Sequence, residues 1–301
     1  MKVNMPIVSI SCITYNHAPY IRECLDGFMM QKTNFAFEVL IHDDASTDGT
    51  ADIIREYEAK YPDIIKPIYQ TENQYSKGIS PSASFNFPRA KGKYIALCEG
   101  DDYWTDPFKL QKQVDFLESH PDYVMCCHSF DELNLINQEK WEPPRISERI
   151  TIDDLIHGRC CIRTLTIMFN RLVLLESKYM NNKSKIDISL YFSLLSKGVG
   201  FYMADTMAIY RKNNGGVWSK LNTSQKWEMS FLNKYHILEC ENNKLSATYM
   251  YHFLKQEYSR KIQLFYGLKI VKSLFKISQY LGLIRALEIL GVILFRYRIK
   301  E

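Results

Sequence analysis

Apolar runs alternate with helical repeats of apolar residues along the first 130 residues of the chain. Runs rich in β-branched and apolar residues predict strands at 7–14, 37–41, 64–69, 94–98 and 123–127. Apolar residues at helical spacing predict helices at 19–30, from Asp48 to about Lys60, and at 107–120. Because the connections are short, the pattern predicts an α/β fold: a doubly wound, mostly parallel sheet with helices on both faces. Asn16, Asp48 and Asp106 are the expected N-caps, with Pro107 at the first position of the third helix.

The second half of the chain has a different pattern. Alternation is lost between Asp131 and about 165, where Pro143-Pro144 indicates a loop and Thr151 a short helix. Strands are predicted again at 165–169 and 201–210, with a helix at 187–196 between them and a flexible loop at 213–216. From about 224 onward only helices are expected. We therefore predict one α/β unit over 1–220 and a helical C-terminal extension over 221–301.

Two acidic clusters directly follow predicted strands. They are Asp43-Asp44 and Glu99-Gly100-Asp101-Asp102. Ligands of parallel α/β sheets bind beyond the carboxyl ends of the strands, which is where both clusters fall. Neighbouring carboxylates repel one another unless a cation is bound, and oxygen ligands suit Mg²⁺ or Mn²⁺. The alternative is an acidic surface turn that caps helices.

Three of the acids, Asp43, Asp44 and Asp187, allow more than one interpretation. Asp43 and Asp44 could accept hydrogen bonds from a base or from ribose hydroxyls, and capping by Asp48 does not account for them. Asp187 opens an apolar helix. It could act as a general base toward a hydroxyl, or it could be an N-cap.

The charge and the cysteine content of the chain limit which partners and which cellular location we expect. The net charge of +4 is too small to indicate nucleic acid, and no nucleic-acid partner is expected. From Lys255 to Glu301, ten Lys/Arg and three Asp/Glu give a local +7, which leaves −3 for the rest of the chain and suggests contact with anionic lipid or acidic polymer. The eight cysteines form no CxxC pair, so we expect reduced thiols in a cytosolic protein without a signal peptide. No apolar run is long enough for an ordinary transmembrane helix.

Three segments together resemble the family 2 glycosyltransferases, which have the GT-A fold. Val8 to Asn16 resembles the first strand of the family with its Thr-Tyr-Asn turn, and Val39 to Thr50 is similar to its most recognisable segment. Gly92 to Trp104 resembles the strand that leads into the DxD-type metal site. The resemblance covers about 5–130 and weakens through 131–185.

The resemblance implies transfer of a sugar, with inversion, from a nucleotide diphosphate donor to a glycan or lipid-linked glycan in cell-surface polysaccharide synthesis. A UDP-sugar is the favoured donor, a metal-dependent hexosyltransferase the favoured type, and Mn²⁺ or Mg²⁺ the expected cofactor. Within 1–220, the donor half would occupy about 1–105 and the acceptor half about 106–220.

The resemblance also assigns roles to individual residues. Asp187 would be the catalytic base, and Asp101 the main metal ligand together with Glu99. The residues implied in binding the nucleotide-sugar are Thr14, Tyr15, Asn16, Asp43, Asp44, Lys77, Glu99, Asp102 and Arg211.

The sequence departs from the family pattern at two positions. Glu99 replaces the usual first Asp of DxD, and Asn213 replaces the His of a Tyr-Arg-x-His loop that closes over the diphosphate. A longer carboxylate can still bind metal or ribose through water, so we expect activity to survive the change to Glu99. If the missing His helps to hold metal or phosphate in relatives, the site here is either weaker or uses Arg211 and Lys212 instead.

Other functions remain as alternatives. A non-catalytic relative that binds nucleotide or glycan is consistent with the two departures. A nucleotide-sugar pyrophosphorylase would need a Gly-rich, basic loop after the first strand, and NAD binding a GxGxxG motif; neither is found. Basic and apolar residues interleave from Leu268 to Lys300, which predicts either an interfacial helix at the cytoplasmic face of a membrane or a helix packed on the catalytic body.

Overall fold

The computed structural model describes residues 5–136, 147–181, 187–213, 215–216, 219–257, 263–283, 285–287 and 289. The predicted loop at Pro143-Pro144, residue Asn214 of the predicted flexible loop, and the predicted tail beyond 289 lie outside these residues.

The described part of the chain forms a nine-stranded mixed sheet in the order β3-β2-β1-β4-β8-β6-β9-β5, with β7 paired to β9. Strands β1 to β4 are parallel, and β6 and β9 share their direction because β8 is antiparallel to both β4 and β6. The short strands β5 and β7 oppose β9. The prediction of a mostly parallel sheet is therefore confirmed. The strands are β1 (Val8–Thr14), β2 (Phe37–Asp43), β3 (Ile65–Tyr69), β4 (Tyr94–Leu97), β5 (Tyr103–Trp104), β6 (Tyr123–Asn134), β7 (Arg149–Ile150), β8 (Met168–Asn170) and β9 (Val199–Lys212).

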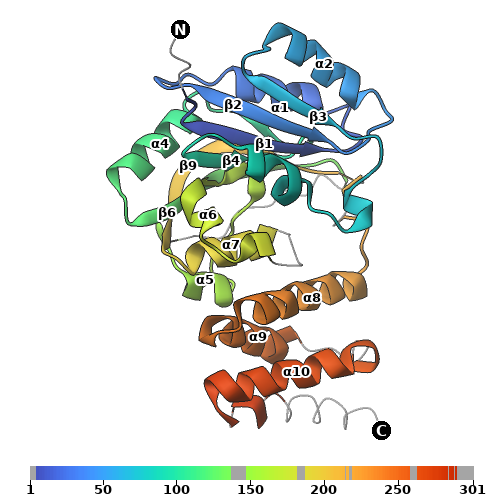
Figure 1. Ribbon diagram of the computed structural model, residues 1–301, viewed down its shortest axis with the longest axis vertical. Helices are drawn as coiled ribbons and strands as arrows, with labels where there is room; N and C mark the ends of the chain where they lie inside the picture. The colour runs from blue at the N-terminus through green and yellow to red at the C-terminus, as the bar shows by residue number, and fades with distance from the viewer. Residues whose placement is uncertain are drawn as a thin grey trace.

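Helices cover both faces of the sheet, as predicted (Figure 1). Alternating side chains of each strand enter different cores: Val8 and Ile10 pack with α1, α2 and α4, whereas Ile95 and Leu97 pack with α3, α5 and α7 on the other face. The helices of this unit are α1 (Ile21–Met29), α2 (Thr50–Lys60), α3 (Phe87–Arg89), α4 (Lys109–Ser119), α5 (Ile152–Ile156), α6 (Arg171–Leu175) and α7 (Asp187–Leu195). Short turns lie at η1 (Tyr75–Lys77), η2 (Ser82–Asn86), η3 (Thr164–Thr166) and η4 (Tyr179–Asn181).

The predicted N-cap at Asn16 is wrong. Helix α1 begins at Ile21, and its N-cap Tyr20 makes no side-chain cap. Asn16 instead adopts a left-handed conformation with φ 54°, and its Oδ1 accepts a hydrogen bond from the N–H of Thr47 at 2.8 Å. The side chain therefore joins two loops, an interaction that local pattern does not reveal.

The other two predicted caps lie just outside their helices. Gly49, with φ 95°, is the N-cap of α2. Asp48 lies one position before this N-cap and accepts a hydrogen bond from the N–H of Thr50. Asp106 accepts from the N–H of Phe108 at 2.7 Å, and α4 begins only at Lys109. In both cases the carboxylate ties down the turn that precedes the helix.

A π-helical turn at η2, continued by α3, was not predicted from the sequence. Within it, Asn86 is fully buried, and its Nδ2 donates to Ser11 Oγ, to the carbonyl of Cys12 and to that of Leu40. Asn86 thus fastens this helical segment beneath β1 and β2.

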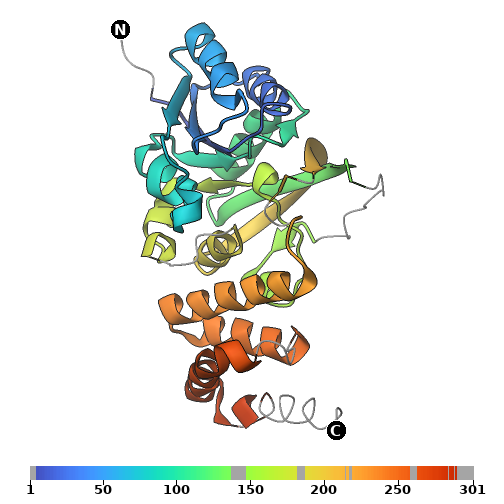
Figure 2. The same cartoon turned by 90° about the vertical axis from the view of Figure 1, so that its right-hand side faces the viewer.

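Three C-terminal helices stack beyond the sheet, as Figures 1 and 2 show, and confirm the predicted helical extension. They are α8 (Thr223–Glu241), α9 (Lys244–Glu257) and α10 (Gln263–Leu281), and they surround a core of their own. Ile237 and Tyr249 join them to the core under the sheet, where the Tyr249 ring stacks on Phe192 with centroids 5.6 Å apart. Within the described residues, no helix is both long and apolar enough to span a bilayer.

Trp104 anchors the short strand β5 against the body. Its Nε1 donates to the carbonyl of Leu165 at 2.9 Å, and its ring meets Phe28 edge-on at 4.8 Å. The Lys109 ammonium lies 3.9 Å from the Trp104 ring centroid and donates to Gln113 Oε1 at 2.7 Å. Lys109 is fully buried, and this burial lowers its pKa to about 7.

We predict that stability depends on pH through Lys109. Between pH 7 and the unfolded pKa near 10.5, the unfolded chain holds a proton on Lys109 that the folded chain has lost, so stability from this group rises with pH. Relative to Lys109→Met, the free energy of unfolding of the wild type should rise by up to about 1.4 kcal/mol per pH unit from pH 7 to 9. Denaturant titrations at several pH values measure the difference. Lys112→Met, on the same helix but partly exposed, is the control and should show no such slope. Parallel curves for wild type and Lys109→Met would contradict the assignment.

Candidate active site

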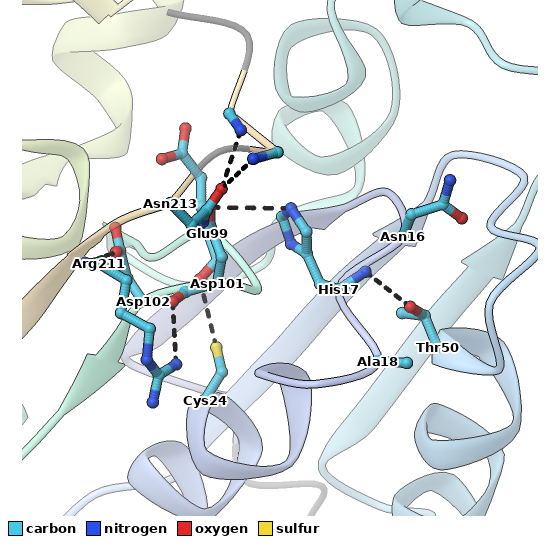
Figure 3. Close-up of polar contacts among 12 residues, drawn as sticks. Asn16, His17, Ala18, Cys24, Thr50, Glu99, Asp101, Asp102, Arg211 and Asn213 are labelled. Carbon is cyan, nitrogen blue, oxygen red and sulfur yellow. Dashed lines mark hydrogen bonds and ion pairs between the residues drawn. The ribbon is translucent and has the colours of Figure 1, made fainter. Parts of the chain in front are cut away.

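The loops that follow β1 and β2 are fastened to each other. The N–H of Asn16 donates to Ser46 Oγ at 2.8 Å, and the N–H of Ala18 donates to Asp48 Oδ2 at 2.9 Å. Figure 3 shows the further contact from the N–H of His17 to Thr50 Oγ1. Tyr15, which directly precedes Asn16, is 46% exposed. The residues predicted to bind the nucleotide-sugar at 14–16 and 43–44 therefore lie together at the ends of β1 and β2, at one edge of the sheet.

Asp43 and Asp44 are both buried but have different partners. Asp43 accepts from the hydroxyl of Ser46 at 2.5 Å, and burial of its carboxyl raises its pKa. The two oxygens of Asp44 accept from the N–H groups of Gln74 and Tyr75, at 2.7 and 3.0 Å. Asp44 therefore positions the segment that carries Lys77, whose ammonium pairs with Glu72.

Three carboxylates meet beyond the end of β4. One ligand atom from each of Glu99, Asp101 and Asp102 lies within 4.8 Å of the others. Asp102 Oδ1 accepts from the main-chain N–H of Arg211 at 2.7 Å, whereas its Oδ2 is buried and has no hydrogen-bond partner among the described residues. Glu99 Oε2 accepts from Thr164 Oγ1 at 3.1 Å.

The electrostatics of this cluster suit a cation. Burial, with the nearby charges of Asp101 and Asp187, raises the pKa of Glu99 to about 8. Burial is the largest cause that raises the pKa of Asp102 well above its usual range, and the charges of Asp101 and Glu99 raise it further. A cation would remove the repulsion and satisfy the unpaired oxygen of Asp102. An all-oxygen donor set fits Mg²⁺ or Mn²⁺.

Gly100 lets the acidic loop lie against the end of β1. A Cβ at this position would come within 2.8 Å of Thr14 Oγ1 and 2.9 Å of Ile21 Cδ1. Thr14 is itself buried, and within the described part of the chain its hydroxyl has no hydrogen-bond partner. Thr14 therefore touches the loop of the carboxylates.

The end of β9 holds the acidic loop from the other side. Arg211 is 5% exposed; its Nη1 donates to the carbonyl of Asp101 at 2.9 Å, and its guanidinium pairs with Glu23 and lies 4.3 Å from the Tyr103 ring centroid. Burial lowers the pKa of Arg211. Two residues later, Asn213 Nδ2 donates to Asp101 Oδ2 at 3.0 Å (Figure 3).

Asp187 is the first residue of α7, as predicted. Its Oδ1 accepts from the N–H of Ile188 at 2.8 Å. Although part of the residue is exposed, crowding by protein atoms removes solvation from the carboxyl and raises its pKa. Its charge also contributes to the raised pKa of Glu99, so the predicted base and metal ligands occupy one electrostatic site.

The sequence did not indicate two basic side chains at this site. The Arg163 guanidinium lies 5.4 Å from the Tyr210 ring centroid, and its charge lowers the pKa values of Glu99, Asp102 and Asp187 against the effect of burial. Arg163 falls where strand and helix alternation is lost, so no pattern could place it. His17 Nε2 lies 3.8 Å from Asp101 Oδ2, and burial lowers the pKa of this imidazole. The only signal for His17 was its position directly after the Thr-Tyr-Asn turn.

Comparisons with known proteins agree with this geometry. The family model described as Glycosyl transferase family 2 matches residues 9–173. An uncharacterized protein of Mycobacterium tuberculosis is 39% identical over 230 residues, 73% of this chain and 64% of its own length. TuaG of Bacillus subtilis, named as a putative teichuronic acid biosynthesis glycosyltransferase, is 30% identical over 74% of this chain and 84% of its own. WfaP of Escherichia coli, a UDP-Glc:α-D-GlcNAc-diphosphoundecaprenol β-1,3-glucosyltransferase, is 27% identical over 70% of this chain and 79% of its own.

A solved structure has the same fold. Residues 1–349 of Staphylococcus aureus TarS, in complex with UDP-GlcNAc, align with a TM-score of 0.65 over 90% of this chain and 81% of that one, at 17% identity. The chain thus spans most of that structure but less than two thirds of the mycobacterial relative.

We predict that Asp102→Asn stabilises the cation-free protein and weakens its response to cation. The amide keeps an acceptor for the N–H of Arg211 but takes a charge out of the cluster. At pH 8 the midpoint of thermal unfolding without cation should rise by about 2–4 °C, which corresponds to about 1 kcal/mol. The rise in the midpoint on adding Mn²⁺ should be smaller in Asp102→Asn than in the wild type. Asp122→Asn, an exposed control, should change neither quantity. A lower cation-free midpoint, or an unchanged Mn²⁺ response, would contradict the interpretation of the cluster.

Proposed function

We propose that this chain, which belongs to glycosyl transferase family 2, is an active enzyme that moves a sugar from a nucleoside diphosphate to a cell-surface glycan. One observation carries the proposal: Glu99, Asp101 and Asp102 each place a ligand atom within 4.8 Å of the others, an arrangement that suits a divalent cation. A UDP-sugar is the favoured donor and a lipid-linked glycan a favoured acceptor. The UDP-GlcNAc complex of TarS and the named substrates of WfaP support these two choices.

In this proposal the edge formed by the β1 and β2 loops binds the nucleoside. Tyr15 offers an exposed ring, and Thr14, Asn16 and Asp43 line the fastened loops around it. Asp44 acts on the segment of Lys77, which would face the base or diphosphate once released from Glu72. The donor half would then occupy about 1–105 and the acceptor half about 106–220.

Asp101 and Glu99, with Asp102 beside them, would hold Mn²⁺ or Mg²⁺. When bound, the cation supplies positive charge that neutralises the diphosphate as it leaves. Arg211, already fixed on the carbonyl of Asp101, and Arg163 would add positive charge from the protein. Glu99 is therefore a workable replacement for the usual Asp, because its carboxylate already reaches the other two.

Asp187 would act as the base of a single displacement with inversion. Its carboxylate takes the proton of an acceptor hydroxyl while that oxygen bonds to the anomeric carbon and the bond from this carbon to the diphosphate breaks. A raised pKa makes the carboxylate a better proton acceptor than an ordinary surface aspartate, provided that it starts ionised. Arg163 helps to keep it ionised.

The C-terminal helices would bring the enzyme to its acceptor. On α10 and directly after it, Phe275, Leu283 and Leu287 are exposed by 72%, 62% and 53%, and Lys272 is exposed near them. Apolar side chains with basic neighbours suit an anionic membrane surface, so we extend the proposal to peripheral contact at the cytoplasmic face.

A second candidate is binding of nucleotide without turnover. The amide at Asn213, where the family has His, favours it. Replacing Asp187 distinguishes the two candidates, because only an enzyme would lose turnover.

We predict that Asp187→Asn reduces turnover by at least about 10²-fold while donor affinity stays within about twofold, because the base acts on the acceptor proton. Donor affinity is measured by titration calorimetry and turnover by release of nucleoside diphosphate. Asp131→Asn, exposed on β6, is the matched control and should behave as wild type. Lost donor binding in Asp187→Asn would make this residue structural, and undiminished turnover would exclude it as the base.

A further inference from the structure

We infer that Asn213 is a positioning residue that holds the carboxylate of Asp101 for the cation, and that the Gly215–Gly216 turn in turn holds Asn213. The inference deepens the proposed function and rests on its cation site.

The hydrogen bonds of Asn213 fix the orientation of its amide. Oδ1 accepts from the N–H groups of Gly215 and Gly216, at 2.8 and 2.9 Å. A main-chain N–H can only donate, so the atom that faces these two groups must be the oxygen. Both of its lone pairs are then used. The remaining group, Nδ2, carries only donors and faces Asp101 Oδ2 at 3.0 Å.

This orientation prevents Asn213 from acting as a cation ligand. A cation needs a lone pair, and the only lone pairs of the amide point into the glycine turn. What Asn213 can offer is a hydrogen bond to a carboxylate that itself binds the cation. At 6% exposure the side chain has little freedom to turn over and exchange these partners.

Asp101 is held at both its main chain and its side chain by the end of β9. Arg211 Nη1 donates to its carbonyl at 2.9 Å, and Asn213 donates to its Oδ2. His17 Nε2 approaches the same oxygen, but 3.8 Å is beyond hydrogen-bond reach. Among the described residues, Asn213 is therefore the side chain that sets the direction of Oδ2, and it leaves Oδ1 of Asp101 for the cation.

Outer hydrogen bonds of this kind strengthen metal sites. Removing a group that orients a ligand typically weakens metal affinity by about 10–100-fold. Coupling is reciprocal: if an ordered turn favours the cation, the bound cation favours the ordered turn. The cation site and the Gly215–Gly216 turn should therefore respond to each other through Asn213.

The test is a titration with Mn²⁺ in the absence of nucleotide, with free Mn²⁺ measured by electron paramagnetic resonance. Asn213→Ala should bind Mn²⁺ about 10–100-fold more weakly than wild type. The matched control is Asn222→Ala, which removes the N-cap of α8 and its 2.9 Å bond from the N–H of Gln225. It should lose stability but keep the wild-type affinity. Thermal unfolding of each variant shows that it is folded.

A second measurement needs no variant. In the wild type, Mn²⁺ should slow amide hydrogen exchange at Gly215 and Gly216, because the bound cation stabilises the turn. Unchanged exchange there, in protein that binds Mn²⁺, would contradict the coupling.

Two results would overturn the role of Asn213 while leaving the proposed function intact. One is wild-type Mn²⁺ affinity in Asn213→Ala. The other is a loss of Mn²⁺ affinity in Asn213→Ala that is seen only when UDP is present. That result would mean that Asn213 acts on the nucleotide and not on Asp101. If the wild type itself bound no Mn²⁺, the proposed cation site and this inference would both be wrong.

Discussion

Repulsion among carboxylates on one short loop is the constraint on which the rest of the site depends. Glu99, Asp101 and Asp102 are brought together by a turn that only works because Gly100 lies flush against Thr14. The fold offsets the repulsion with single hydrogen bonds from Arg211, Asn213 and Thr164. These donors do not complete the site, because Asp102 Oδ2 stays buried and finds no hydrogen-bond partner in the residues that the structure describes. Such a cluster costs stability, and its persistence is best explained by a positive ligand.

The surrounding fold supplies the rigidity that this arrangement needs. Parallel pairing of β2, β1 and β4 brings three loops to one edge, and Asn86 locks two of these strands from beneath. On the opposite side, β9 pairs with β5, so that Arg211 holds Asp101 and Asp102 while Trp104 anchors the residues just after the acidic segment. Residues more than a hundred positions apart in the chain thus define one small volume of charge.

Much of this could be predicted from the sequence because the relevant signals are local. Runs of apolar residues predict β1, β2 and β4, and the acids directly after these strands are assigned to the ligand edge by their position alone. What failed needed contacts between distant segments. Asn16 is a residue type that favours N-caps, but its side chain instead accepts a hydrogen bond from the N–H of Thr47. Arg163 reaches the site from a region without periodicity. The role of Asn213 was likewise hidden, since the direction of an amide follows from its partners and not from its residue type.

The central claim is that one end of the sheet binds a nucleoside diphosphate together with a divalent cation. The most direct measurement is the midpoint of thermal unfolding with a panel of nucleoside diphosphates, each with and without Mn²⁺, in the wild type and in Asp101→Ala. Ligands that bind only the folded state raise the midpoint according to their affinity. We expect one nucleotide, UDP, to give a rise that requires Mn²⁺ and is lost in Asp101→Ala. Folded protein whose midpoint responds to no nucleotide, with or without Mn²⁺, would contradict the account.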